Sequence, residues 1–285
     1  MTANILVVGA AGKFAGLVVP ELVRRGARVR GLVRDDAAAG RARARGCHEA
    51  VVGDLRDVRS LGRAMRGIDG VFHIGPAFAP DEAQLGLNVV AAASEAGVRK
   101  FVFSSVIQPT NTDLTNHTSK IPVEAALFRS GLEYTILHPA NFMQNVAGAW
   151  RKALQDGVFA EPFPVDTRLA RVDYRDVAEV AARALTEDAL RFGSYELMSE
   201  MIDRKTIAAM MTEFAGRSIE AEELSFDAWV ARYSPPYNVD QLQLLAKVFE
   251  HYAAHGLGGN DLTLRAILGR PPRTMREFLR DLASS

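Results

Sequence analysis

The stretch NILVVGAAGKFAG, residues 4–16, decides the fold of this chain, and LVVPELVRRG follows it as residues 17–26. Its first five residues form a largely apolar run typical of a buried strand, and the glycines after them predict a tight turn. Residues 17–25 have the apolar spacing of an amphipathic helix, which Gly26 would end. This order places backbone N–H groups and a helix N-terminus where a phosphate can bind.

The glycines of the turn have distinct expected roles. Gly9 allows the tight turn, and Gly12 lets the backbone approach a pyrophosphate. Ala15 or Gly16 would keep the helix close to the strand. The alternative is a strand-to-helix turn without a ligand, but strand and helix stand where a dinucleotide site requires them. We therefore expect the turn to contact a dinucleotide through Gly9, Ala11, Gly12, Lys13 and Phe14.

The next predicted strand, residues 28–34, ends in a cation, Arg34. A guanidinium suits the 2′-phosphate of NADP(H), to which it donates two parallel hydrogen bonds. NADP(H) is therefore favoured over NAD(H). Asp35 and Asp36 follow at once and are interpreted as the N-cap of a helix over residues 36–45. If the strand ended one residue later, Asp35 would face the ribose and the preference would reverse.

Lys13, in the glycine turn, is a second candidate cation for the phosphate. Three further arginines lie in the predicted helix that follows Arg34. A solvated helix face is the expected position of all three, although they would add to the positive field. They are Arg41, Arg43 and Arg45.

Composition excludes several classes of function. The 285 residues carry 34 basic and 34 acidic side chains and no net charge, which disfavours a nucleic-acid partner. The one cysteine, Cys47, excludes an internal disulfide and a Cys-x-x-Cys metal site, and no metal is expected. No signal peptide is apparent, and no apolar run approaches the ~18 residues that span a bilayer. We expect a cytoplasmic protein without a membrane partner, as a monomer or homodimer.

Strand and helix patterns alternate along the first two thirds of the chain. Strands are predicted at 49–53, 70–75, 100–104, 134–137 and 195–198, and helices at 58–65, 81–96, 119–129 and 177–185. This alternation indicates an α/β fold with a doubly wound, Rossmann-type parallel sheet. A ligand then binds at the carboxyl ends of the strands.

The alternation stops after Glu200. Residues 201–214, 225–233 and 239–255 have helical patterns, and with 150–170 they would form a small, mostly helical substrate lobe. A capping box at Thr274 predicts one more short helix. We thus expect an NAD(P)-binding Rossmann core over residues 1–149. A mixed segment over 150–285 would complete the sheet and form the lobe.

Several motifs together resemble the NmrA-like family of the atypical short-chain dehydrogenase/reductase superfamily. The resemblance implies a Rossmann domain, bound NADP(H) and a small C-terminal substrate lobe. The family includes reductases of quinones, azo dyes, triphenylmethane dyes and phenylpropanoids, and also regulators that bind the dinucleotide without known catalysis. Besides the glycine turn, the motifs are LVR at 32–34, GDL at 53–55, FVFSS at 101–105, SGLEYTILHP at 130–139, NFMQN at 141–145, VDYRDVA at 172–178 and GRPPRT at 269–274.

The resemblance also assigns residues to the cofactor. Asp54 would accept the adenine amino group and Leu55 would cover the ring, whereas a helix N-cap is the alternative for Asp54. A small residue among Ile74, Gly75 and Pro76 would admit the ribose. Hydroxyls of Ser104 and Ser105 would meet the nicotinamide ribose or a substrate oxygen, unless they bond backbone groups at a strand end. Pro139, Asn141 and Phe142 match the nicotinamide-side loop, although ordinary core is the alternative for Phe142.

The chain departs from the superfamily at the catalytic position. The usual Tyr-x-x-x-Lys has become Asn116-x-x-x-Lys120, and asparagine cannot donate a proton as a general acid. Lys120 would bind the ribose or act as the acid, and His117 is another candidate donor. The alternatives are a solvated lysine at a helix start and an exposed loop histidine. His138, where the family often shows arginine, is interpreted as a polar group at a strand end rather than a catalyst.

These features predict an NADPH-dependent reductase that transfers hydride to a conjugated or aromatic small molecule, such as a quinone, enone or imine. One alternative is a non-catalytic NADP(H)-binding regulator that senses redox state for a protein partner. Another is an enzyme that keeps the cofactor as a scaffold for redox-neutral chemistry. The retained Lys120 favours an enzyme.

Overall fold

Residues 2–284 are described here from a computed structural model of the chain. They form two compact units. The first comprises the residues up to Thr112 together with Asn116–His138 and Arg175–Tyr195. The second comprises Asp113–Thr115, Pro139–Tyr174 and the residues from Glu196 onward.

A seven-stranded sheet in the order β10-β6-β5-β4-β1-β2-β3 organises the first unit. Every pairing among β1 to β6 is parallel, which confirms the predicted doubly wound α/β fold. The strand order reverses beside β1, and ligands of such sheets bind at the carboxyl ends of the strands there. The strands are β1 (Asn4–Val8), β2 (Arg28–Val33), β3 (Glu49–Val52), β4 (Gly70–Ile74), β5 (Lys100–Ser104), β6 (Glu133–Pro139) and β10 (Gly193–Leu197).

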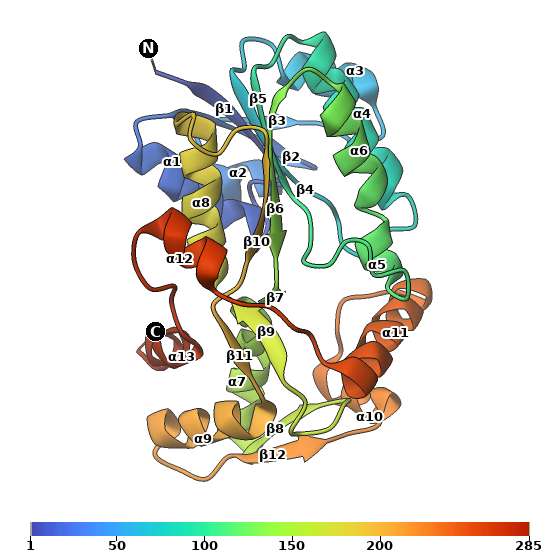
Figure 1. Cartoon of the computed structure of the whole chain (residues 1–285), viewed down its shortest axis with the longest axis vertical. Coiled ribbons are helices and arrows are strands. Elements are labelled where there is room, and N and C mark those ends of the chain that lie inside the picture. The colour runs from blue at the N-terminus through green and yellow to red at the C-terminus, as the bar shows by residue number, and fades with distance from the viewer. Residues whose placement is uncertain (1, 285) are drawn as a thin grey trace. The chain divides into compact units, whose positions relative to one another are not determined.

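Helices cover both faces of this sheet. Figure 1 shows α1, α2 and α8 on one side and α3, α4 and α6 on the other. The second group packs on one continuous apolar core, to which Val71, Phe101, Phe103 and Ile136 contribute from the strands. The helices are α1 (Ala15–Arg24), α2 (Asp36–Ala44), α3 (Val58–Ala64), α4 (Glu82–Glu95), α6 (Ile121–Arg129) and α8 (Tyr174–Thr186). The short helix α5 (Thr115–Thr118) precedes α6.

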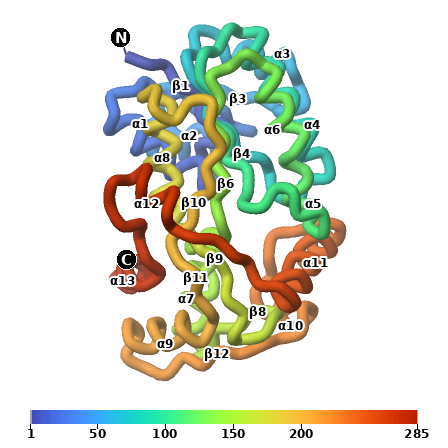
Figure 2. The backbone as a smooth tube through the Cα atoms, in the orientation of Figure 1, coloured from blue at the N-terminus to red at the C-terminus, as the bar shows by residue number. Residues whose placement is uncertain are grey.

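The second unit contains a three-stranded sheet, β11-β9-β7, and a two-stranded one, β12-β8. Trp150, Phe159, Ile207 and Phe278 belong to its apolar core, and Figure 2 traces its backbone. Its strands are β7 (Asn141–Phe142), β8 (Val158–Glu161), β9 (Leu169–Val172), β11 (Glu200–Ile202) and β12 (Glu220–Glu223). Its helices are η1 (Met143–Asn145), α7 (Val146–Asp156), α9 (Arg204–Ala215), α10 (Phe226–Tyr233), α11 (Val239–His255), α12 (Leu262–Leu268) and α13 (Met275–Ala283).

The predicted helices 225–233 and 239–255 are confirmed to within one residue, and so is the capping box of Thr274 with Glu277. The predicted helix 201–214 is wrong at its start. Its first residues belong to β11, which pairs antiparallel with β9, and Asp203 caps the helix that follows. β12 was not predicted at all. Both strands owe their conformation to partners far away in the sequence, which local patterns do not show.

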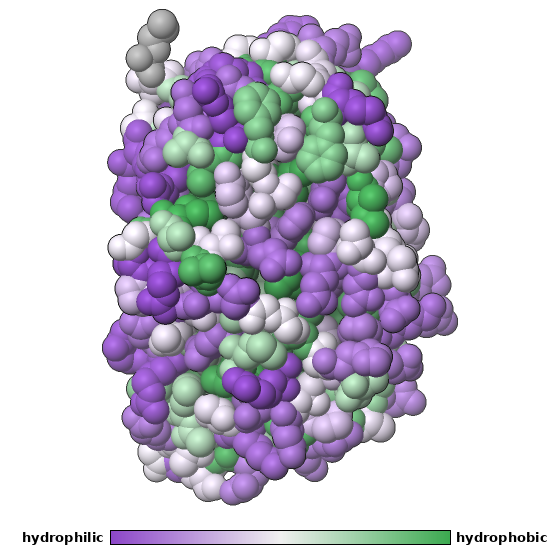
Figure 3. Space-filling model, in the orientation of Figure 1, coloured by the Kyte–Doolittle hydropathy of each residue, from purple (hydrophilic) through white to green (hydrophobic). Residues whose placement is uncertain are grey.

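Among the helices that the structure describes, none combines the length and apolar composition needed to cross a bilayer. On the face shown in Figure 3, hydrophobic residues occur in small groups between hydrophilic ones.

Candidate functional site

The glycine turn after β1 has the backbone that a pyrophosphate requires. Gly9 has a φ of 70°, and its N–H donates to the Leu32 carbonyl over 2.9 Å. The Gly12 N–H donates back to the Gly9 carbonyl over 2.7 Å, and a methyl group on Gly12 would lie 3.0 Å from that oxygen. Because α1 begins at Ala15, the positive end of its helix dipole lies at the turn. These residues therefore fit a dinucleotide.

Gly16 makes room for the side chain of Arg45. A methyl group on Gly16 would overlap the guanidinium of Arg45, whose Nη1 donates to the Gly12 carbonyl and lies 3.5 Å from the Ala10 carbonyl. The prediction that Arg45 lies on a solvated helix face is therefore wrong. It caps the C-terminus of α2, from where its long side chain reaches the glycine turn.

Arg34 is the first residue after β2, and its side chain is exposed. The carboxylate of Asp35 accepts a hydrogen bond from the Ala38 N–H over 2.7 Å, which confirms Asp35 as the N-cap of α2. The Asp35 carboxylate therefore bonds the helix backbone, and Arg34 is the charged residue at the end of β2. Lys13 is exposed and lies 5.3 Å from the centre of the Phe14 ring. Ala11 and Phe14 are half-buried.

Asp54 does not cap α3, because Asp57 does. The Asp54 Oδ1 accepts instead from the Arg56 N–H over 2.9 Å, and its side chain is exposed. Leu55 is half-buried against the apolar core, and its carbonyl accepts from Asn88 over 2.9 Å.

Gly75, after β4, makes room for a carboxylate. A methyl group on Gly75 would lie 2.6 Å from the Glu82 Oε1, at the start of α4. Ile74 is half-buried and Pro76 is exposed. The small residue expected here for the ribose is thus also required by a protein side chain.

That carboxylate holds Lys120. The Nζ of Lys120 donates to Glu82 Oε1, and the two residues are 7% and 4% exposed. Ser119 donates to the other carboxylate oxygen, Oε2, over 3.1 Å. Lys120 is therefore no solvated lysine at a helix start. It is a buried cation next to the carboxyl ends of β4 and β5, paired with a buried anion.

Asn116 and His117 lie beside this pair in sequence. His117 is 2% exposed, and its Nδ1 lies 3.2 Å from the Gln108 carbonyl, so the alternative of an exposed loop histidine is wrong. Asn116 is half-buried, and its carbonyl accepts from Ser119 over 3.3 Å.

A second buried cluster lies one turn further along α6. The Ser105 hydroxyl donates to Glu124 Oε1 over 2.5 Å, and His138 Nε2 lies 3.0 Å from the same oxygen. The hydroxyl of Ser105 thus bonds a carboxylate rather than the backbone. His138 is a polar group near the end of β6, as predicted. Ser104 is fully buried.

Glu82 and Glu124 were missed from the sequence. Glu124 follows Lys120 by four residues, the spacing that puts two side chains on one helix face, and this was the available indication. Glu82 had no such indication, because it lies in another helix.

The residues expected in a loop after β6 are instead the end of that strand, Pro139, and the short strand β7, and they belong to the second unit. Pro139 is buried, and Asn141 Oδ1 accepts from Arg171 Nη1 over 3.1 Å. Phe142 is half-buried, with its ring edge-to-face on Tyr174 at 4.7 Å between centres.

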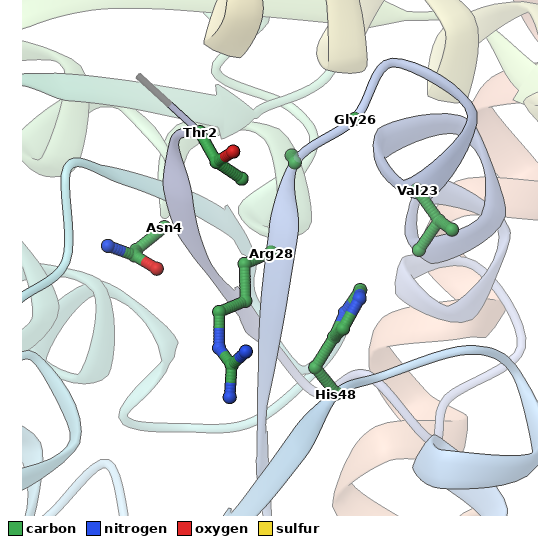
Figure 4. Close-up of a pocket in the computed structure, with 7 residues that line it drawn as sticks. Thr2, Asn4, Val23, Gly26, Arg28 and His48 are labelled. Atoms are coloured by element: carbon green, nitrogen blue, oxygen red, sulfur yellow. The ribbon is translucent and has the colours of Figure 1, made fainter.

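A pocket of about 330 Å³ lies at the amino ends of β1 and β2, where Asn4, Arg28 and His48 line it (Figure 4). The glycine turn and Lys120 are at the carboxyl ends, so this pocket is separate from the candidate site. Within residues 2–284 no cluster of three or more histidine, cysteine or acidic side chains is arranged to hold a metal ion.

Comparison with known proteins agrees with this geometry. The model of the NmrA-like family matches residues 1–279. The chain belongs to the NmrA-like family. It is 30% identical to an NAD(P)H azoreductase of Xenophilus azovorans over 99% of this chain and 98% of the relative.

Two solved structures resemble nearly the whole chain. An NADPH-dependent quinone oxidoreductase of Escherichia coli, in complex with NADPH, superimposes with a TM-score of 0.84 at 26% identity, over 98% of this chain and 99% of its own. The triphenylmethane reductase of Citrobacter sp. gives a TM-score of 0.86 at 20% identity, over 98% and 99% of the two chains, and this likeness concerns the fold.

Proposed function

We propose that this NmrA-like protein is an NADPH-dependent reductase that transfers hydride to a conjugated or aromatic small molecule, such as a quinone, enone or imine. The observation that carries the proposal is the buried Lys120 at the carboxyl edge of a sheet whose first strand leads into a glycine turn and a helix. The names of two relatives, an azoreductase and a quinone oxidoreductase, support the same class of reaction.

The first unit supplies groups for each part of the cofactor. The turn residues Gly9 and Gly12 and the start of α1 would hold the pyrophosphate. Arg34 would bind the 2′-phosphate, and Asp54 would bind the adenine. Ser104, Ser105 and Lys120 would lie toward the nicotinamide end. When bound, NADPH supplies the hydride.

Lys120 has the central part in this proposal. An acceptor that gains a hydride develops negative charge on an oxygen or nitrogen, and a fixed cation stabilises that charge most where water is excluded. The Lys120 ammonium is buried and held by Glu82, so it is oriented before an acceptor arrives. Asn116 offers an amide that can hydrogen-bond a carbonyl but cannot supply a proton.

The test is a cofactor-oxidation assay with quinones, enones, imines and azo dyes, in which NADPH and NADH are compared with each acceptor. We expect turnover with at least one class and a preference for NADPH. If no acceptor oxidises NADPH while the protein binds it, the reductase proposal is wrong. A change of affinity for a protein partner on NADPH binding would then identify a regulator.

A further inference from the structure

We propose that Ser105, Glu124 and His138 form a proton relay that protonates the reduced acceptor through the Ser105 hydroxyl. The inference deepens the proposed reductase function and rests on it. It supplies the proton donor that the replacement of the usual tyrosine by Asn116 removes.

The three side chains converge on one atom. Glu124 Oε1 accepts from Ser105 Oγ over 2.5 Å and lies 3.0 Å from His138 Nε2. A carboxylate oxygen only accepts, so His138 must carry its proton on Nε2 to make this bond. In the resting protein Ser105 and His138 therefore both donate to Glu124 Oε1, and this one oxygen links the two side chains.

The fold fixes this chain from three elements. Ser105 continues the ladder after β5, because its N–H donates to the Leu137 carbonyl over 2.8 Å. His138 is in the neighbouring strand β6, and Glu124 reaches both residues from α6. Ser105 is 5% exposed, and the side chains of Glu124 and His138 are each 12% exposed. All three side chains are thus largely shielded from water.

A serine hydroxyl alone is a poor acid, because its alkoxide is strongly basic. Glu124 removes this difficulty if it returns a proton as the hydroxyl proton leaves. The Ser105 hydroxyl first turns its O–H from Glu124 Oε1 toward the reduced acceptor. Its Oγ–H bond then breaks as an oxygen or nitrogen anion of that acceptor takes the proton. Ser105 Oγ then takes a proton from Glu124, which takes one from the His138 imidazolium. NADPH is the two-electron reductant. After the step the relay has lost one proton, and the proton is missing from His138.

Imidazole is the side chain suited to the outer end of such a relay, because it gains and loses a proton near neutral pH. Lys120 is the N-cap of α6, one turn before Glu124, and is bonded to Glu82. The fixed charge of Lys120 stabilises the anion of the reduced acceptor, and the relay then protonates this anion.

Glu124→Gln is the decisive variant. Glutamine has nearly the same shape and its amide oxygen can accept both hydrogen bonds, but it cannot carry a proton. We expect kcat to fall about 10²-fold with enones and imines, whose reduced anions are strongly basic, and less with quinones. KM should change little. His138→Gln, whose amide N–H can still donate to Glu124, should lower kcat and leave KM nearly unchanged in the same way as Glu124→Gln. Ser105→Ala should lose activity that Ser105→Thr retains.

The matched control is Glu95→Gln, an exposed glutamate at the end of α4, which should leave kcat unchanged. A readout independent of turnover is the NMR signal of the His138 ring in the protein without cofactor. The Nε2–H proton should resonate far downfield and shift upfield in Glu124→Gln.

The outcomes separate the relay from the reductase proposal. If NADPH oxidation proceeds with some acceptor but Glu124→Gln turns over like the wild type, the relay is wrong and the reductase stands. If Glu124→Gln slows all acceptors equally and raises KM, Glu124 only positions its neighbours, and the relay is also wrong. If no acceptor is reduced, the function fails first, and the His138 signal then reports only whether the hydrogen bonds exist.

Discussion

Gly86 of α4 lies against Val123 of α6, so closely that a methyl group on Gly86 would come within 2.5 Å of a Val123 methyl. This approach brings the beginnings of the two helices together. Glu82 stands one turn before Gly86, and Lys120 stands three residues before Val123. The pairing of Glu82 with Lys120 is therefore a consequence of how two helices pack.

Gly86→Ala should lower the free energy of unfolding by about 1–2 kcal/mol, because the added methyl overpacks a side chain that is 2% exposed. The control is Gly62→Ala in α3, where nothing lies within 4 Å of the new methyl. That change should be neutral or stabilising by up to about 1 kcal/mol. Urea denaturation measures both. Equal effects at the two positions would contradict the close approach of α4 and α6.

Lys120→Met should reduce kcat by about 10²-fold, since the fixed positive charge is lost. NADPH binding should weaken less, because the phosphate contacts remain. Asn116→Ala should have a smaller effect, as it removes one hydrogen-bonding amide. Lys247→Met, which replaces an exposed lysine on α11, is the control and should have no effect.

The same pair predicts coupling in stability. Glu82→Gln and Lys120→Met should each destabilise the protein, because each leaves a buried group without its partner. The double variant should lose less stability than the sum of the two, by about 1 kcal/mol or more. Additive losses would mean that the two side chains are independent.

The histidine three residues before Lys120 is tested by turnover. A larger kcat loss in His117→Ala than in Lys120→Met would assign the central role to the histidine.

Arg34→Ala should weaken NADPH binding about ten- to hundredfold, because a charge-assisted contact worth about 1.5–3 kcal/mol disappears. NADH binding should stay nearly the same. Arg41→Ala, an exposed arginine of α2, provides the control. Titration calorimetry with both cofactors decides the matter. Equal affinity of the native protein for NADPH and NADH would refute a role of Arg34 in cofactor choice.

His73 of β4 should make the fold sensitive to acid. Burial, aided by the charge of Lys120, lowers the pKa of His73 from 6.5 to about 3. Its ring stacks on Phe103 at 5.6 Å, and neither ring nitrogen has a hydrogen-bond partner among the described residues. Protonation therefore favours the unfolded chain, and the stability present above pH 6.5 is lost progressively as the pH falls toward 3.

His73→Phe should keep the stacked ring and remove this dependence. Between pH 7 and pH 5 the wild type should lose about 2 kcal/mol more stability than the variant, at about 1.4 kcal/mol per pH unit below 6.5. His255→Phe, which replaces an exposed histidine of α11, should keep the wild-type slope. Parallel slopes for wild type and His73→Phe would show that His73 does not titrate between the two states.

Local patterns predicted much of the first unit. The apolar run of β1 and the turn at Gly9 lie within a few residues of each other, so strand, turn and helix are encoded where they form. Asp35 caps α2 and Thr274 caps α13 through bonds that span three residues, which is why both caps were predictable. The strands β11 and β12 were missed because each is stabilised by a distant partner.

The sequence by itself determined the doubly wound sheet, the glycine turn and the place of Lys120 and Arg34 at the edge of that sheet, because periodicity, glycines and caps act over short distances. Only the tertiary structure decided what those side chains meet. Glu82 reaches Lys120 across 38 residues, and Arg45 reaches Gly12 across 33. The carboxylate between Ser105 and His138 likewise comes from another element. Such pairs depend on how helices and strands pack, and burial makes each partner necessary to the other.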